Sequence, residues 1–341
     1  MDTVMRCGRQ TFRYEDVYIT SHSAIGGEKE GQGPLKDWFD IILEDDLLGT
    51  NSWEQAESEM QRRAVDHLLT QAGLSADDLQ LLLGGDLNAQ IIASTFAARK
   101  IGAPFFGLYG ACSTFVQAIV LGSALISGGF AENAACIASS HFCTAERQFR
   151  SPLELGTQRP PQASWTATAC GCVLLENRRG NSRLRVTHGT VGRIIDLNIT
   201  DANHMGAAMA PAVYDSIAAH FDDTGRSADD YDLIATGDLG WIGRNILLEL
   251  FARGNVIMPP DKLIDCGASL FYQEQDAHAG GSGCGCVASV CSGMLLKKIE
   301  SGSLHRILVA GSGAMLSPVS SQQRQSIPGI SYAMSVEEVK A

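Results

Sequence analysis

A cysteine follows a glycine-containing turn in the first half of the chain. Segment 105–129, FFGLYGACSTFVQAIVLGSALISGG, leads through two glycines to Cys112 and continues as an apolar stretch of helical character. A thiol at the start of a helix lies where the helix dipole and free backbone N–H groups favour a thiolate. The same N–H groups can bind a carboxylate or an oxyanion, so the position suits acyl transfer and anion binding alike. The alternative is a buried cysteine that only packs in an apolar core.

Two histidines and two aspartates are candidates for the same crevice. His141 ends the apolar strand that follows the Cys112 helix, and His278 precedes a second glycine-rich turn, AGGSGCGC. Each histidine is either a catalytic acid–base group or a hydrogen-bonded structural residue. Asp86 and Asp238 each follow a short apolar strand, where they either serve the crevice or cap the next helix.

An internal repeat relates the two aspartates. Segments 73–87, GLSADDLQLLLGGDL, and 225–239, GRSADDYDLIATGDL, align without gaps at a constant offset of 152 residues, and 9 of their 15 positions are identical. Each copy is interpreted as a turn, a short apolar strand and a Gly-Asp-Leu that leads into a helix. Downstream, each half supplies a glycine-rich turn, an apolar helix and a further apolar strand. The chain therefore contains the same structural plan twice.

This duplication predicts an α/β fold of two related halves, residues 1–180 and 181–341, with layered sheets and helices around a pseudo-twofold axis. Alternating strands and helices predict mostly parallel sheets with right-handed crossovers. The axis would bring Asp86 near Asp238, and Cys112 near the second glycine-rich turn. The crevice between these residues is the expected site.

Composition limits the class of protein. Of 341 residues, 45% are hydrophobic and 19% charged, which suits a compact globular protein. The formal net charge of −12 argues against a nucleic-acid partner, because phosphate binding needs a basic face. Ten cysteines are too sparse for a secreted disulfide scaffold. Since the sequence has neither a signal peptide pattern nor an unbroken apolar run of about 18 residues, we expect a soluble, reduced, cytoplasmic protein.

No metal site is expected from the paired cysteines. Cys170 and Cys172 form a C-x-C pair in segment 163–176, ASWTATACGCVLLE, which is predicted as one strand with small residues on one face. Cys284 and Cys286 form a second pair in the second glycine-rich turn. Structural zinc usually takes cysteines with two to four residues between them, whereas a single residue lies between the cysteines of each pair here. Both pairs are therefore interpreted as small residues that allow close packing.

Several motifs together resemble a known family. GGDLNAQ, LYGACST, SSHFCTAERQFR, TVGRIIDLNITD, MGAAMAPA and AGGSGCGC, spread over nearly the whole chain, resemble the stage V sporulation protein AD family. That family is similar in fold to the thiolase superfamily, which includes condensing enzymes of the ketoacyl synthase III type. In those enzymes a catalytic His follows the strand that matches 233–236, and an Asn lies in the second turn. Here the sequence reads TGDLGWIG without a His, and Gly281 stands where the Asn is expected.

The resemblance implies a non-catalytic thiolase-like protein that binds dipicolinic acid (pyridine-2,6-dicarboxylate), free or as its calcium chelate, and needs no cofactor. Without the His and the Asn, condensation lacks an acid–base group and an oxyanion donor, so Cys112 is left with acyl capture at most. The alternative from another class is an acyltransferase or condensing enzyme of the ketoacyl synthase III type with Cys112 as its nucleophile. A scaffold with a vestigial crevice is a third hypothesis.

The ligand implied by the resemblance is a small planar dianion with two carboxylates to satisfy. Backbone N–H groups around Cys112 and Ser113 are expected to hold one carboxylate. Arg147 or Arg150 is expected to meet the other through a bidentate fork, which a lysine cannot form. The alternative for this segment is that Glu146 and Arg150, spaced i, i+4, form only a surface pair on a helix.

Further residues complete the expected binding set. Ser140 and His141 end the neighbouring strand and can donate hydrogen bonds into the crevice. Asp86 and Asp238 would orient donors, or engage calcium if the chelate binds. Gly281 of the second turn is placed in the same set.

The resemblance also implies a biological setting. The protein would be a soluble component of the spore dipicolinate uptake complex during sporulation, located in the forespore cytoplasm. It would be peripheral to the spore inner membrane, held there by other proteins of the complex. Thiolase-like proteins commonly dimerise, so a homodimer is left open.

Overall fold

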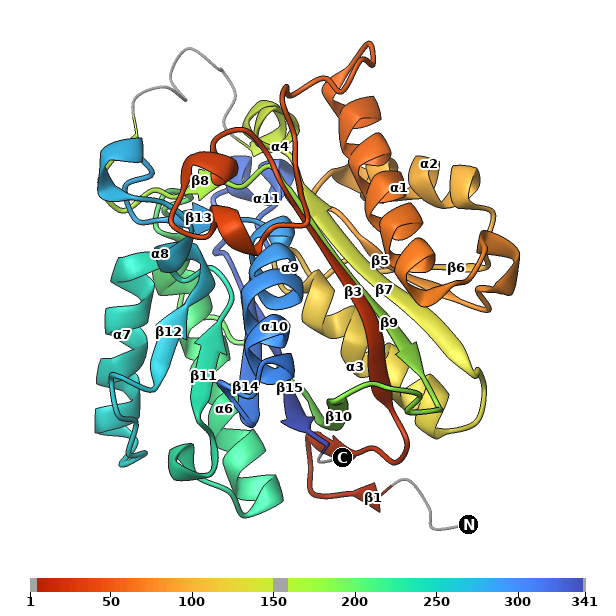
Figure 1. The fold of residues 1–341 in the computed structure, drawn as a ribbon. Helices are drawn as coiled ribbons and strands as arrows, with labels where there is room; N and C mark the ends of the chain where they lie inside the picture. Colours follow the sequence, from red (N-terminus) through yellow and green to blue (C-terminus); the bar gives the residue numbers. More distant parts are fainter. Residues whose placement is uncertain (1–4, 150–158, 340–341) are drawn as a thin grey trace.

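The computed structural model describes residues 5–149 and 159–339 (Figure 1). The principal strands of the N-terminal half are β3 (Tyr18–Gly26), β5 (Leu82–Gly85), β6 (Phe105–Gly107), β7 (Asn133–Ser140) and β9 (Ala169–Glu176). Those of the C-terminal half are β10 (Leu184–Val191), β11 (Leu233–Thr236), β12 (Leu263–Asp265), β14 (Arg306–Ala314) and β15 (Gly329–Glu338). The short strands are β1 (Met5–Arg6), β2 (Thr11–Arg13), β4 (Ile41–Ile42), β8 (Trp165–Thr166) and β13 (Gly281–Ser282).

The α-helices are distributed over both halves. Those of the N-terminal half are α1 (Trp53–Ala72), α2 (Ile92–Ile101), α3 (Thr114–Ser127) and α4 (Phe142–Phe149). Those of the C-terminal half are α6 (Met205–Thr224), α7 (Gly240–Arg253), α8 (Cys266–Leu270), α9 (Cys284–Val290), α10 (Leu296–Glu300) and α11 (Pro318–Gln322).

The two halves have the same strand order. The order of neighbouring strands in the first half is β6-β5-β7-β9-β3. In the second half it is β12-β11-β14-β15-β10. Strands β3 and β10 pair at Ile19↔Leu184 and Tyr18↔Arg185, which joins the halves. The predicted α/β fold of two duplicated halves is confirmed, while the division after residue 180 stays a prediction.

The expectation of mostly parallel sheets is wrong. β5 pairs in parallel with β6 and β7, and β11 with β12 and β14, because helices α2, α3 and α7 cross between successive strands. β9 and β15 instead run antiparallel to both of their neighbours. Each half is therefore a mixed sheet, parallel on one side and antiparallel where it meets the other half.

Helices form three layers with the two sheets between them (Figure 1). In the central layer α3 contacts β5, β7 and β9 of one half and β10, β14 and β15 of the other. Beside α3, helix α9 packs on β9, β7 and β3, and α10 reaches β10 and β15. Helices α1 and α2 cover the outer face of the first sheet, and α6 and α7 cover that of the second. The central layer carries both glycine-rich turns.

The sequence repeat has a local physical basis. Helices α1 and α6 each end at a glycine, and each is followed by a serine–aspartate capping box around a short 3-10 turn. The Asp78 carboxylate accepts the Ser75 backbone N–H at 2.8 Å, and Asp230 accepts that of Ser227 at 2.8 Å. The turns span Ala76–Asp78 and Ala228–Asp230, and the strands that follow them begin at Leu82 and Leu233.

The segment predicted as one strand at 163–176 forms two. β8 pairs in parallel with β13, whereas β9 joins the main sheet. Between them Thr168 donates its N–H to the buried Glu30 carboxylate at 3.1 Å, and its carbonyl accepts the Gly27 N–H at 2.7 Å. Because these partners lie outside the ladder, the strand breaks at this point.

Close packing of α9 on β9 depends on a small residue. A Cβ at Gly171 would lie 2.0 Å from the carbonyl oxygen of Ala288 in α9, so only glycine lets the helix approach this strand. Every residue of α9 is buried, and so is every residue of the π-helical turn Cys291–Leu295 that joins it to α10. The prediction of small residues that allow close packing is confirmed here.

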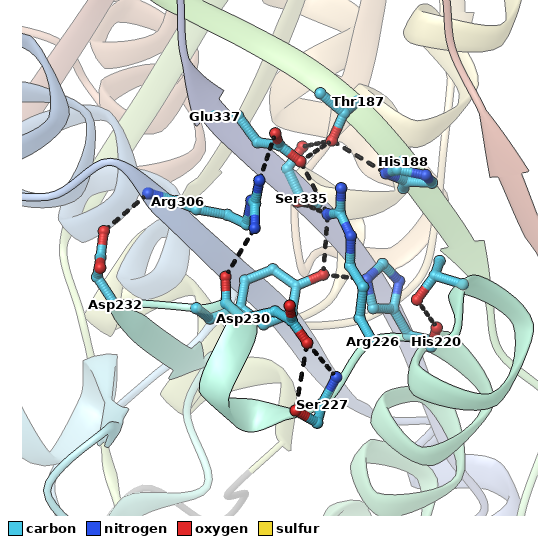
Figure 2. A network of polar contacts seen from close by, with 12 residues as sticks. Thr187, His188, His220, Arg226, Ser227, Asp230, Asp232, Arg306, Ser335 and Glu337 are labelled. Carbon is cyan, nitrogen blue, oxygen red and sulfur yellow. Dashed lines mark hydrogen bonds and ion pairs between the residues drawn. The ribbon is translucent and has the colours of Figure 1, made fainter.

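A polar cluster lies where β10, β15 and α6 meet (Figure 2). Arg226 pairs with Glu337 at 2.8 Å and donates to the Tyr231 hydroxyl at 3.3 Å. That hydroxyl also forms a 2.6 Å hydrogen bond with Nε2 of His220. The His188 ring lies edge-on to His220, with ring centroids 6.1 Å apart. Burial lowers the pKa of His220 to about 3 and that of His188 to about 4, so both imidazoles are neutral at physiological pH.

Gly171→Ala should destabilise the fold through the steric clash with α9. We expect the free energy of unfolding to fall by about 3 kcal/mol, the upper part of the range for overpacked cores. Gly73→Ala, at an open helix end, is the control and should cost about 1 kcal/mol. Chemical denaturation measures both, and equal losses would contradict the close-approach argument.

Acidification should destabilise the protein through the two buried histidines. An unfolded histidine binds a proton with a pKa near 6.5, whereas the folded protein binds it only near 3 to 4. Unfolding therefore takes up protons between about pH 6.5 and 4, and stability falls as the pH falls through this window. His220→Gln should lower the slope of the unfolding free energy against pH by about 1.4 kcal/mol per pH unit.

Denaturation of both proteins at several pH values within this window tests the prediction. The variant is needed as a reference because Asp238 and Glu57, whose pKa values burial raises to about 7 and about 8, change stability with the opposite sign. Identical slopes for the two proteins would show that His220 is not the group responsible.

Candidate functional site

The first glycine-rich turn places Cys112 between β6 and α3. Ala111 has a φ of 49°, a left-handed conformation that non-glycine residues seldom adopt. The Ser113 N–H and Oγ both donate to the Gly110 carbonyl, at 3.1 and 2.6 Å, and Thr114 Oγ1 donates to the Ala111 carbonyl at 2.7 Å. The turn is therefore closed on itself. The expectation that the Ser113 N–H holds a ligand carboxylate is wrong, because that N–H bonds the backbone.

The second turn places Gly283 opposite the end of β7. Its φ of 99° suits glycine, and a Cβ there would lie 2.6 Å from Ser140 Oγ. Ser140 Oγ donates to the Ala167 carbonyl at 2.7 Å and accepts the Gly285 N–H at 3.2 Å. Ser140 therefore fastens the start of α9 to the first half.

Asp238 links the two turns. Its carboxylate accepts hydrogen bonds from Ser312 Oγ at 2.7 Å and from the Gly283 N–H at 2.8 Å, and the Cys112 thiol also contacts it. Burial raises the pKa of Asp238 to about 7. Burial, followed by the Asp238 charge, raises the pKa of Cys112 well above its usual value. Burial and the neighbouring acid therefore oppose the thiolate that the start of a helix would favour.

Asp86 has a different role from Asp238, the equivalent residue of the second half. Its carboxylate accepts the Asn88 N–H at 2.8 Å, the Ser94 N–H at 2.7 Å and Ser94 Oγ at 2.6 Å, so it caps the start of α2. In the second half Asp265 takes this role, since it accepts the N–H groups of Leu239 and Gly240, both at 2.9 Å. The duplicated sequence therefore does not predict that Asp238 alone faces the cysteine.

Asp86 also lies beside a second buried acid. The Glu57 carboxylate accepts Ser139 Oγ at 2.9 Å, Asn88 Nδ2 at 2.9 Å and Thr144 Oγ1 at 3.0 Å. Burial and the charge of Asp86 raise the pKa of Glu57 to about 8. At neutral pH this pair therefore retains a proton, and its oxygens are occupied by the protein.

A cavity opens at Cys112, with an empty volume of about 450 Å³ that includes its mouth. We call it the Cys112 cavity. Its lining is mainly apolar or aromatic, with the thiol, a carboxylate and three hydroxyls among the polar groups. The lining residues are Leu87, Tyr109, Ala111, Cys112, Ala145, Glu146, Phe149, Thr166, Met205, Ser282, Gly283, Ala314 and Leu316.

Of the predicted binding residues, Cys112 lines this cavity, and Asp238 lies directly behind it through Gly283. His141 is buried, but its Nε2 donates to the Asp46 carbonyl at 2.8 Å and its Nδ1 accepts the Cys143 N–H at 3.2 Å. Burial lowers the pKa of His141, so the ring is neutral and committed to the backbone.

The remaining predicted residues lie outside the cavity lining. The Arg147 side chain is half exposed, forms an ion pair with Glu54 and lies over the Trp53 ring. Gly281 pairs in β13 and faces Leu270. Arg150 lies outside the described residues.

His278 belongs to a different, open pocket. There it lies 3.7 Å from Asp276, beside the exposed rings of Trp241 and Tyr272.

Sequence reasoning missed the charged pair at the cavity wall. Glu146 is buried and lines the cavity, and its Oε2 lies 3.0 Å from Nη2 of Arg159. The interpretation of Glu146 as part of a surface pair is therefore wrong. Arg159 stands in a Pro-rich stretch, QRPPQ, without periodicity, so no sequence pattern connects it to Glu146.

The chain matches the family described as stage V sporulation protein AD (SpoVAD) over residues 8–337. The stage V sporulation protein AD of Bacillus subtilis (strain 168) is 40% identical over 331 residues, 97% of each chain. OleA from Xanthomonas campestris has a TM-score of 0.63 at 14% identity, covering 98% of this chain and 100% of that one. The 3-oxoacyl-(acyl carrier protein) synthase III, FabH, from Pseudomonas aeruginosa has a TM-score of 0.56 at 14% identity, covering 95% of this chain and 98% of that one. These likenesses confirm the predicted thiolase-like fold.

Alkylation of Cys112 by iodoacetamide should be slow, at least about 100-fold slower than that of an unperturbed thiol at pH 7.5. Asp238→Asn should accelerate it, because the variant removes the negative charge that disfavours the thiolate. Mass spectrometry of the Cys112 peptide measures the rate, with the Cys7 peptide as the internal control. Rapid labelling of the parent protein, unchanged in the variant, would contradict the arrangement described.

Proposed function

The chain belongs to the stage V sporulation protein AD family, and from this premise we propose that it binds dipicolinic acid in the Cys112 cavity. The observation that carries the proposal is a small, mainly apolar cavity with a few polar groups at its wall, which is the usual form of a site for a small aromatic ligand. Thr166 and Ser282 supply hydroxyls, and the ligand enters as the free dianion or as its calcium chelate.

The proposed role is non-catalytic. The histidine and asparagine of condensing enzymes are absent from the corresponding positions: Asp238 follows β11, and Gly281 stands in the second turn. Of these two residues, Asp238 contacts Cys112. Burial and the Asp238 charge raise the pKa of Cys112, so its thiol is a weak nucleophile, and among the residues that the structure describes neither a histidine nor an asparagine lines the cavity beside it. The raised pKa of the Cys112 thiol therefore supports a site that binds its ligand without reacting with it.

The proposed setting is the spore dipicolinate uptake complex, on the forespore side of the inner membrane. In the described part of the chain, no helix is both long and apolar enough to cross a bilayer. Attachment through other proteins of the complex is consistent with that finding.

A homodimer is also part of the proposal. β6 is the last strand on the sheet path, with Phe106 48% exposed, and Phe96 on the adjoining α2 is 41% exposed. An edge strand with large exposed rings beside it favours contact with another chain.

Calorimetric titration with dipicolinate, with and without calcium, tests the binding. We expect saturable binding by the parent protein and by Cys112→Ala, because no covalent bond is needed. Ala145→Phe should abolish it by filling the cavity, and Arg147→Ala, outside the cavity, is the control. Absence of saturable binding of either form by the parent protein would refute the proposal.

A second candidate is an acyltransferase that uses Cys112. Its support is the strained turn that presents the thiol to a cavity, together with the likeness in fold to a 3-oxoacyl-(acyl carrier protein) synthase III. It predicts an acyl adduct on Cys112 after incubation with acyl-CoA, detectable by mass spectrometry and absent in Cys112→Ala. An adduct without dipicolinate binding would favour this candidate over the first.

A further inference from the structure

A buried ion pair separates the Cys112 cavity from an aromatic cluster. Glu146 of α4 lines the cavity, and Arg159 lies behind it with 3.0 Å between Oε2 and Nη2. Each of the two side chains is only 6% exposed. Taking two charges out of water costs several kcal/mol per ion unless geometry and further hydrogen bonds compensate. Stabilising the cavity wall is therefore not a sufficient reason for a buried ion pair at this position.

Aromatic rings hold the arginine in place. The Phe142 and Trp165 rings stack with centroids 4.0 Å apart and planes at 11°. The guanidinium carbon of Arg159 lies 4.3 Å from the Trp165 centroid and 5.0 Å from that of Phe142. The Lys29 ammonium lies 4.0 Å from the same Trp165 ring. Stacking orients the guanidinium plane without occupying its N–H donors.

Within residues 5–149 and 159–339, one N–H donor of the Arg159 guanidinium has no acceptor. Its Nε is buried and has no hydrogen-bond partner among the residues that the structure describes. A guanidinium presents five N–H donors in a planar fork that matches a carboxylate. A buried donor without an acceptor is costly, so an incoming carboxylate at this position would be stabilised by donors that are already desolvated and oriented.

We propose that Arg159 binds a carboxylate of the ligand in the Cys112 cavity, and that Glu146 occupies this arginine in the empty protein and competes with the ligand for it. The inference rests on the proposed function, since it presumes that the cavity takes an aromatic dicarboxylate. It assigns to Arg159 the role that the sequence suggested for Arg147. The ligand exchanges one carboxylate partner of Arg159 for another, so Glu146 sets how tightly an anion must bind to enter.

The test compares variants by calorimetric titration with dipicolinate in the presence of a calcium chelator, so that Glu146 cannot act as a calcium ligand. Arg159→Gln should weaken binding about 100-fold, the loss expected for a charge-assisted bidentate contact. Glu146→Gln should strengthen binding about tenfold, because the variant removes the competing charge and keeps the shape. Arg147→Gln, on the same helix as Glu146 and paired with Glu54, is the matched control and should bind as the parent protein does.

The gain in affinity of Glu146→Gln is the decisive result, because misfolding cannot produce it. If the parent protein binds dipicolinate but Glu146→Gln binds equally or more weakly, or Arg159→Gln binds normally, the inference is overturned while the proposed function stands. If the parent protein does not bind at all, the proposed function fails, and this inference fails with it.

Discussion

One buried carboxyl group, that of Asp238, connects the two halves of the molecule at their most constrained point. It accepts the Gly283 N–H at the start of one central helix and contacts the Cys112 thiol near the start of the other. Both helices are packed between sheets, so neither can shift to relieve a change at this position. The attachment of the second turn and part of the rise in the Cys112 pKa both depend on this carboxyl group.

The shared fold does not by itself determine the chemistry at this contact. At 13–14% identity, the solved structures retain the arrangement of strands and helices over nearly the whole chain. A layered core tolerates such divergence because it requires apolar volume and small residues at close approaches. The chemistry at the turns needs particular side chains, and here the titratable group that contacts the thiol is a carboxyl, that of Asp238. A shared fold therefore does not by itself assign a reaction.

The architecture could be predicted because its signals are local and occur twice. Gly-x-Ser-Ala-Asp-Asp marks a helix end and a capping box in both halves, and apolar strands follow at the same spacing. The antiparallel pairing of β9 and β15 could not be predicted. The direction of a strand depends on the path of the chain that leads to it and not on the hydrophobic pattern of the strand itself. The break between β8 and β9 likewise depends on Glu30, more than 130 positions away.

The site was predictable only in part, for the same physical reason. Cys112 stands in a motif, but Asp86 and Asp238 stand in identical ones, and their difference arises from a third acid, Asp265, that caps α7 in place of Asp238. Arg147 and Arg150 stand in the motif SSHFCTAERQFR, whereas Arg159 stands in a stretch of sequence with neither motif nor periodicity. Partners of buried charges are chosen by tertiary packing, which short-range patterns do not encode.

The π-helical turn between α9 and α10 has a consequence for how the second half packs. An α-helix advances about 100° per residue, so one inserted residue would rotate everything beyond it to another face. A wider turn absorbs such an insertion, and here it is completely buried, with Gly293 against the Trp38 carbonyl. The side chains of α10 therefore face other directions than they would if α9 continued as a regular α-helix, and this offset is what lets one continuous helix fit both the second turn and the strands packed against α10.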